Sequence, residues 1–265
     1  LGFMNNPAFI IGKDSVIIID PGSRLDSGRM VLRQLRKITN KPVPLVFNSH
    51  VHGDHWLGNQ ALREEYLDAK FYAHPELIRT AKESEAESWV QLLSKLTKGA
   101  TDGTRAVIPE NALQDGDTVK ISGLTVKVHI MPAVHSHTDA MFEIVEDSVL
   151  FTGDNTTYKR IARFEDGTFR GTIAAVDKIL ADNYKHYVPG HGPAGNKEII
   201  ESFRNYVVTL YETVAELYEL GMSDFEMKDM VIAKLGAYHD WPGFEDEVGK
   251  HISFALLEAE KAAFE

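Results

Sequence analysis

Three histidines and one aspartate lie within six residues of one another in the segment 48–55, which reads Asn-Ser-His-Val-His-Gly-Asp-His. Imidazole nitrogens and carboxylate oxygens are the ligands that a borderline metal such as Zn²⁺ accepts in proteins. The apolar run 44–47 before this segment is typical of a strand, and the run 60–67 after it is typical of a helix. The sequence therefore predicts four metal-ligand side chains on a loop at the end of a strand, and the fold must accommodate that loop.

The spacing of these ligands favours two adjacent metals over one. His50 and His52 point to the same side of an extended segment, because side chains alternate along it. Gly53 tolerates backbone angles that other residues resist, so a turn there can present Asp54 and His55 in another direction. The alternative is a polar surface loop with histidines present by chance, and the regular H-x-H-x-D-H pattern argues against it.

Length and charge exclude several classes of function. The chain has 265 residues, 43% of them hydrophobic, which suits one large domain or a domain with an appendage. Its net charge of −11 disfavours nucleic acid as a partner, because such surfaces need a basic footprint. No run approaches the roughly 18 apolar residues of a membrane span. Cysteine is absent, so thiolate metal sites are excluded and the cellular compartment stays open.

Strands and helices are mixed along the chain, which indicates the α/β class with layered sheets. The wholly apolar run 15–19 predicts a strand buried on both faces, and it ends at Asp20. The Asp20 carboxylate either accepts hydrogen bonds from a neighbouring loop or serves as a turn former. Strand-like runs deliver histidine or aspartate to a following loop three more times. These loops hold His135 and His137, then Asp154, and then His191.

The chain changes character after Asn196, where helical patterns replace the mixed ones. We predict helices over 199–220, from a capping box at 223–226 to about 235, and over 245–264. This organisation predicts a catalytic domain over 1–195 and a helical appendage over 196–265 packed on it. Apolar residues recur at helical spacing in the first of these helices, and such a stripe must be buried against another surface. We expect Tyr238, His239 and Trp241 to be the appendage residues nearest the substrate pocket.

Taken together, five motifs give the chain its resemblance to the metallo-β-lactamase superfamily. They occur in the family's order and span residues 19 to 192. The resemblance implies a four-layer αββα sandwich with a dinuclear metal site along one edge. The motifs are Ile19-Asp20-Pro21-Gly22, the H-x-H-x-D-H loop at 50–55, Ser136-His137-Thr138, Phe151-Thr152-Gly153-Asp154 and Gly190-His191-Gly192.

The resemblance also implies a set of metal ligands. The first metal would be held by His50, His52 and His137, the second by Asp54, His55 and His191, and Asp154 would bridge the two. His137 matches the family better than His135, because the family's ligand directly precedes Thr or Ser. His135 then becomes a pocket residue or a support for a ligand. Two Zn²⁺ ions are the expected cofactor, with Fe or Mn as alternatives because a bridging carboxylate is a hard ligand.

Departures from the subfamilies narrow the resemblance. A bridging Asp154 in a chain without cysteine argues against a dedicated β-lactamase. The segment 136–140 differs from the glycine-rich version that glyoxalase II-type thioesterases and persulfide dioxygenases carry. The chain is most similar to the sulfur-oxidation and quinoprotein-relay group of hydrolases. Several members of that group are exported, which favours the periplasm over the cytoplasm.

The expected activity is hydrolysis of a small ester, thioester, lactone or amide by a hydroxide that the two metals share. Asp54 would be the catalytic residue, since it could hold that hydroxide while ligating the second metal. A mononuclear iron enzyme of the persulfide-dioxygenase type, using His50, His137 and Asp154, is the first alternative. A non-catalytic binding domain is the second. The expected partner is a small-molecule substrate, and the sequence leaves the oligomeric state open.

The remaining histidines match no motif of the family. His129 falls on the polar face of the alternating run 124–130, and we predict that it is solvated. The others are expected to be ordinary surface or core residues. They are His74, His186, His239 and His251.

Overall fold

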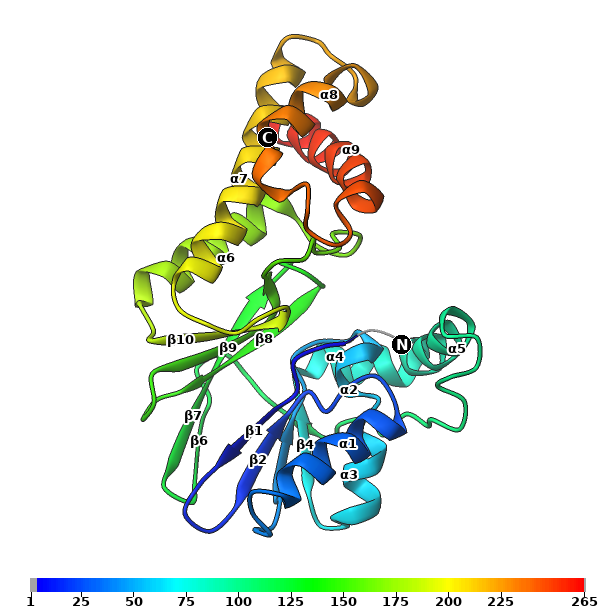
Figure 1. Cartoon of the computed structure of the whole chain (residues 1–265), viewed down its shortest axis with the longest axis vertical. Coiled ribbons are helices and arrows are strands. Elements are labelled where there is room, and N and C mark those ends of the chain that lie inside the picture. The colour runs from blue at the N-terminus through cyan, green and yellow to red at the C-terminus, as the bar shows by residue number, and fades with distance from the viewer. Residues whose placement is uncertain (1–3, 265) are drawn as a thin grey trace. The chain divides into compact units, whose positions relative to one another are not determined.

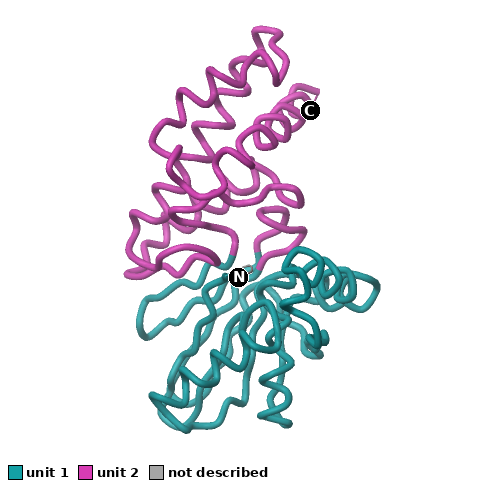
Figure 2. Tube along the Cα trace, turned by 45° about the vertical axis from the view of Figure 1, so that its right-hand side comes forward, with its two compact units in different colours: residues 1–130, 140–153 teal, residues 131–139, 154–265 magenta. Residues whose placement is uncertain are grey.

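A computed structural model describes residues 4–264 of the chain, which forms two compact units. The first unit contains residues up to 130 together with 140–153, and the second contains 131–139 and everything from 154 onward (Figure 2). Three strands, β7 (Leu124–Pro132), β8 (Thr138–Ile144) and β9 (Val149–Thr157), pass from one unit to the other. Residue 195, the domain boundary expected from the sequence, lies inside the second unit.

The first sheet belongs wholly to the first unit, and its strands β1, β2 and β4 are labelled in Figure 1. Its order is β1-β2-β3-β4-β5, with an antiparallel β1–β2 hairpin and parallel pairing from β2 through β5. Strand β2 is buried along its whole length, as its apolar sequence predicts. The strands are β1 (Ala8–Ile11), β2 (Val16–Ile19), β3 (Leu45–Phe47), β4 (Lys70–Ala73) and β5 (Asn111–Ala112).

Both faces of this sheet are covered within the first unit. Helices α1 (Leu25–Arg36) and α3 (Asn59–Glu65) pack together, and their apolar side chains join those of Ile18 and Val46 in one core. Side chains on successive strand residues alternate, so Phe47 points to the opposite face. There its ring stacks on that of Phe142 in β8, with 5.3 Å between centroids. The unit is therefore layered as helix, sheet and second sheet.

The second sheet has the order β10-β9-β8-β7-β6. Strands β6 (Thr118–Ile121) and β10 (His186–His191) complete it, and the β6–β7 and β8–β9 pairs are antiparallel. The two sheets flanked by helices form the predicted αββα fold. The prediction that His129 is solvated was wrong. It is buried, and its Nε2 lies 2.8 Å from a carboxylate oxygen of Glu143 on the neighbouring strand.

The helices of the second unit pack on one another around α7. The predicted apolar stripe of α7 is buried at Tyr206, Val207, Leu210 and Val214. On α9, His251 is wholly buried with its Nδ1 2.7 Å from the Tyr206 hydroxyl, and burial lowers the pKa of His251 to about 3. This histidine is therefore a neutral core residue. The helices are α6 (Phe169–Asp182), α7 (Glu198–Glu219), α8 (Asp224–Lys234), the 3-10 turn η2 (Gly236–Tyr238) and α9 (Phe244–Ala263).

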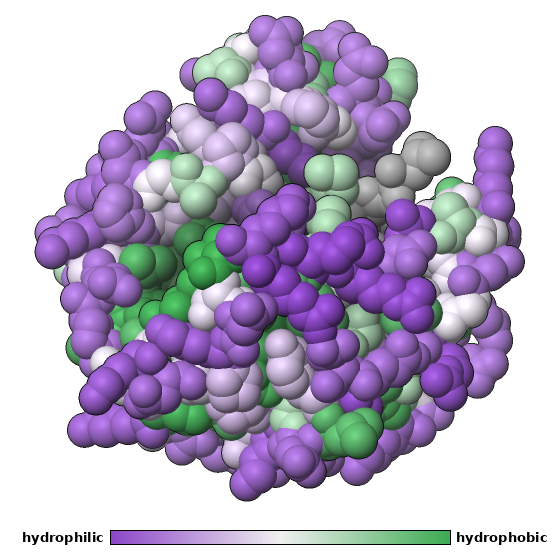
Figure 3. Space-filling model, turned by 60° about the horizontal axis from the view of Figure 1, so that its bottom comes forward, coloured by the Kyte–Doolittle hydropathy of each residue, from purple (hydrophilic) through white to green (hydrophobic). Residues whose placement is uncertain are grey.

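The surface agrees with the acidic, polar composition. The face drawn in Figure 3 is mostly hydrophilic, with hydrophobic residues in smaller patches. Within residues 4–264, none of the helices combines the length and the apolar composition needed to cross a membrane.

Two helical glycines provide a matched test of the packing. A Cβ built on Gly28 of α1 would lie 2.3 Å from the carbonyl oxygen of Gly58, whereas one built on Gly249 of α9 would meet nothing within 4 Å. We expect Gly28→Ala to destabilise the protein by about 1–3 kcal/mol through overpacking. We expect Gly249→Ala to stabilise it by about 0.5–1 kcal/mol, because alanine loses less backbone entropy in a helix. Urea unfolding of both variants measures the difference, and equal effects would contradict the close approach of α1 to Gly58.

Candidate functional site

The histidine loop, residues 48–55, directly follows β3 and continues into the short helix α2 (Gly53–Trp56). His50 and His55 are buried, and their ring centroids are 4.3 Å apart. The ring of His52 is partly exposed and lies 4.7 Å from that of His50. Buried Asp54 has a carboxylate oxygen 3.8 Å from Nε2 of His55. The loop thus gathers the four ligand side chains that its sequence predicts.

Asp20 orients two of these imidazoles. One oxygen of its buried carboxylate accepts from the Ser49 backbone N–H at 2.8 Å, and the other accepts from the Ser49 hydroxyl at 2.6 Å. The second oxygen also lies 2.9 Å from Nδ1 of His55. The Ser49 hydroxyl in turn lies 2.9 Å from Nδ1 of His50. With Nδ1 engaged on both rings, Nε2 is the atom each can offer to a metal, so Asp20 has the supporting role rather than only that of a turn former.

The segment that carries Asp20 is fastened to the histidine loop by its backbone. The Gly22 N–H donates to the carbonyl of His55 at 3.0 Å, and the Gly58 N–H donates to the carbonyl of Gly22 at 2.6 Å. A Cβ on Gly58 would lie 2.4 Å from the Pro21 oxygen, so only glycine permits this approach. The two loops therefore hold a common geometry around the imidazoles.

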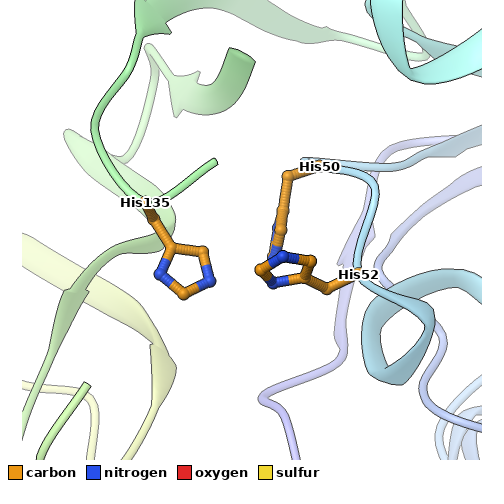
Figure 4. Close-up of side chains that lie close together, drawn as sticks. All are labelled: His50, His52 and His135. Carbon is orange, nitrogen blue, oxygen red and sulfur yellow. The ribbon is translucent and has the colours of Figure 1, made fainter. Parts of the chain in front are cut away.

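The second unit contributes another group of ligand types around Asp154, near the end of β9. One Asp154 carboxylate oxygen lies 3.3 Å from Nε2 of His135 and 3.3 Å from Nε2 of His191. All three side chains are buried. His191 is the last residue of β10, and His135 lies on the segment between β7 and β8. Figure 4 shows the backbone from which His135 extends, and also His50 and His52 on the histidine loop.

His135, and not His137, is the histidine that contacts Asp154. The Asp139 carboxylate accepts from the backbone N–H of His135 at 3.0 Å and of Ser136 at 2.8 Å. This turn buries His135 and leaves His137 exposed. The motif match to the following threonine could not reveal the turn. Among the described residues, groups of His and Asp that could hold a metal ion include His50, His52, Asp54, His55, His135, Asp154 and His191, and His137 is in none of them.

One residue of the helical segment approaches His191. The Trp241 ring packs edge-on against Tyr158 with 5.8 Å between centroids, and the Tyr158 N–H donates to the carbonyl of His191 at 3.2 Å. Tyr238 is one step further away, since its ring packs against Trp241 and its hydroxyl donates to the carbonyl of Ser202. Of the three residues expected near the pocket, Trp241 is therefore connected to a predicted ligand through a single residue, Tyr158.

The chain is similar in sequence to several curated proteins and in fold to several solved structures. A probable metallo-hydrolase of Methanocaldococcus jannaschii is 24% identical over 74% of this chain and 91% of its own length. A linear primary-alkylsulfatase of Pseudomonas is 25% identical over 82% of this chain, which spans only 48% of that protein. Among solved structures, a sec-alkyl sulfatase has a TM-score of 0.70 at 15% identity, over 85% of this chain and 42% of that one. A metallo-beta-lactamase from Pontibacter korlensis has a TM-score of 0.58 at 17% identity, over 76% of this chain and 86% of that one.

The family model described as the metallo-beta-lactamase superfamily matches residues 1–191. That range includes the histidine loop, the turn with His135, Asp154 and His191. The match covers well over half of the chain and agrees with the fold and with the residue types of both ligand groups. The chain belongs to the metallo-beta-lactamase superfamily and is, at that general level, a metal-dependent hydrolase.

Proposed function

We propose that the chain is a hydrolase with a dinuclear metal centre, with zinc as the leading metal and iron or manganese as alternatives. The buried imidazoles and carboxylates are the donor set that such metals accept, and the rings of His50 and His55 are already oriented. His135 takes the place that the sequence suggested for His137. The proposed ligands are His50, His52 and His135 for one metal, Asp54, His55 and His191 for the other, and Asp154 for both.

The observation that carries this proposal is that β8 and β9 each contain a residue that lies beside Ser49 of the histidine loop, and that both strands also lead to the second ligand group. A Cβ on Gly153 would lie 3.2 Å from Cβ of Ser49, and Asp154 is the next residue, with its Cα about 3.8 Å further along the chain. The Ala140 N–H donates to the Ser49 carbonyl at 2.9 Å, and the preceding Asp139 holds the turn of His135. β9 thus passes beside Ser49 at Gly153, one residue before Asp154, and β8 does so at Ala140, five residues after His135.

Bound metals would supply a water of lowered pKa and polarise the oxygen of the scissile bond. Asp54 provides the proton chemistry: one carboxylate oxygen would ligate, and the other would accept a hydrogen bond from the attacking water. The water proton would pass to Asp54 and then to the leaving group as the bond to that group breaks. Asp20 and Ser49 would keep two imidazoles in place during this sequence.

The substrate class in this proposal is a small ester, thioester, lactone or amide. The likeness to two alkyl sulfatases favours a sulfate ester as the second candidate, because one match covers 85% of the chain. Residues 1–195 are less than three quarters of the 265, so that match extends into the helical segment. A hydrolysis panel with zinc-, manganese- and iron-loaded protein decides between these classes. Oxygen consumption with one iron per chain would instead favour the persulfide-dioxygenase reading.

The choice between the two histidines can be tested by metal content. We expect zinc-saturated wild type to retain two metals per chain after dialysis, and His135→Ala to lose about half of this metal because a buried ligand is removed. His137→Ala should retain both metals, because that side chain is exposed. Mass spectrometry of the metal content measures all three proteins. Loss of zinc from His137→Ala alone would restore the ligand set expected from the sequence.

The role of Asp54 is separable from metal binding. Asp54→Asn keeps an oxygen ligand of similar size but removes the proton acceptor. We expect turnover on the substrate found by the panel to fall by about 10²–10⁴-fold while most of the metal stays bound. Asp54→Ala, which removes the ligand as well, is the matched comparison. Turnover that falls only in proportion to lost metal would reduce Asp54 to an ordinary ligand.

A further inference from the structure

Trp89 packs against the histidine loop, and the helix to which it belongs carries none of the proposed ligands. It belongs to α5 (Ala86–Leu96), and its ring centroid is 5.0 Å from that of His52, with the rings inclined at 47°. A Cβ built on Gly53 would lie 2.7 Å from Cβ of Trp89, so the helix rests directly on the first residue of α2. Trp89 is thus held against a proposed metal ligand by backbone packing as well as by its ring.

A π-helical turn sets the rotation of α5 that makes this contact. The segment η1 (Ala81–Glu85) joins α4 (Pro75–Thr80) to α5, and the Ala86 N–H donates to the carbonyl of Ala81. In an α-helix, residues five apart are turned by about 140° from one another, but the i to i+5 bond of a π-turn returns Ala86 to the face of Ala81. Both alanines are buried in one cluster with Leu77 and Leu93. Trp89, three residues after Ala86, consequently faces the same side.

The part of the histidine loop around His52, where Trp89 makes its contact, is the part accessible to solvent. Of the four proposed ligands on the loop, His52 alone is partly exposed, while the other three are buried. Trp89 is also partly exposed, and so is Val51, whose carbonyl accepts from the buried indole of Trp56 at 2.8 Å. Val51 and Trp89 pack on the same apolar cluster, so each offers a partly exposed apolar side chain next to His52.

We propose that Trp89 is a specificity-determining residue that binds an apolar acyl or alkyl chain of the substrate. The proposal rests on the hydrolase function proposed above and narrows its substrate class. The indole presents a large, rigid apolar face at little conformational cost, and its neighbour His52 places that face beside the reacting group. The π-turn keeps it there. Substrates with a chain of several carbons are favoured over those with a methyl group.

The test compares two carboxylates that mimic reaction products, acetate and octanoate, on the zinc-loaded full chain. We expect isothermal titration calorimetry to show octanoate binding at least about tenfold more tightly than acetate, because its extra methylene groups leave water. Trp89→Ala should remove most of this ratio, and Trp89→Phe should keep most of it. Val90→Ala is the matched control, since Val90 packs on the same cluster from the next position of α5. An unchanged ratio in Trp89→Ala overturns the proposal.

A second measurement uses the wild-type sequence and therefore does not depend on whether a Trp89 variant folds. The chain has three tryptophans, and in 5-fluorotryptophan protein the fluorine resonance of Trp89 should shift with octanoate and not with acetate. Trp56 is wholly buried, so its resonance serves as the internal reference. A Trp89 resonance that octanoate does not move overturns the subsite alone. A wild-type chain that takes up none of zinc, iron and manganese overturns the proposed function and the subsite together.

Discussion

The hydrogen bonds of the Asp20 carboxylate are the interaction on which the proposed centre depends most. A buried charge is costly unless it is paired or hydrogen-bonded, and this one contacts the backbone and hydroxyl of Ser49 and the ring of His55. Asp20 adopts a positive φ of 47°, a conformation that costs an ordinary residue about 1 kcal/mol. Such strain persists where the surroundings impose it. Here Asn5 donates to the Asp20 carbonyl. Gly22 donates to the carbonyl of His55, and Pro21 lies close to Gly58.

Several residues of the proposed centre lie at or just beyond the end of a strand. β2 leads into Asp20, β3 into the histidine loop, and β10 ends on His191. Strands are rigid elements, and a ligand placed at the end of one is held more precisely than a ligand on a free loop. Where a ligand does lie on a turn, as His135 does, Asp139 binds the backbone of that turn. Carboxylates thus stabilise both of the segments that carry histidines away from regular structure.

The helices have a different part in this arrangement. Helix α5 depends on a π-turn for its rotation, and such turns are frequent at functional sites. In the second unit, the chain after α8 brings Trp241 against Tyr158, which is hydrogen-bonded to His191. Each unit therefore has an aromatic side chain from a helical region near one of the proposed ligands.

The sequence by itself determined the elements and the ligand types. Its apolar runs predicted the buried strand β2 and the stripe of α7, and the spacing of the histidine loop, with the resemblance it supports, predicted the fold of two sheets flanked by helices. These features are local, since periodicity and ligand spacing are read within a few residues. The choice between supporting and turn-forming roles for Asp20 stayed open at that level, because its partners Ser49 and His55 are about thirty residues away.

Only the tertiary structure decided which side chains meet. His135, rather than His137, contacts Asp154, and a turn whose backbone donates to Asp139 buries His135 while His137 is exposed. His129 is buried and contacts Glu143 on the next strand, although its own strand places it among polar residues. Trp89 reaches His52 through a π-turn and a glycine in another helix. The physical reason is common to all three: the contact that decides each outcome is made with a residue distant in the sequence, Asp154 for His135, Glu143 for His129 and His52 for Trp89.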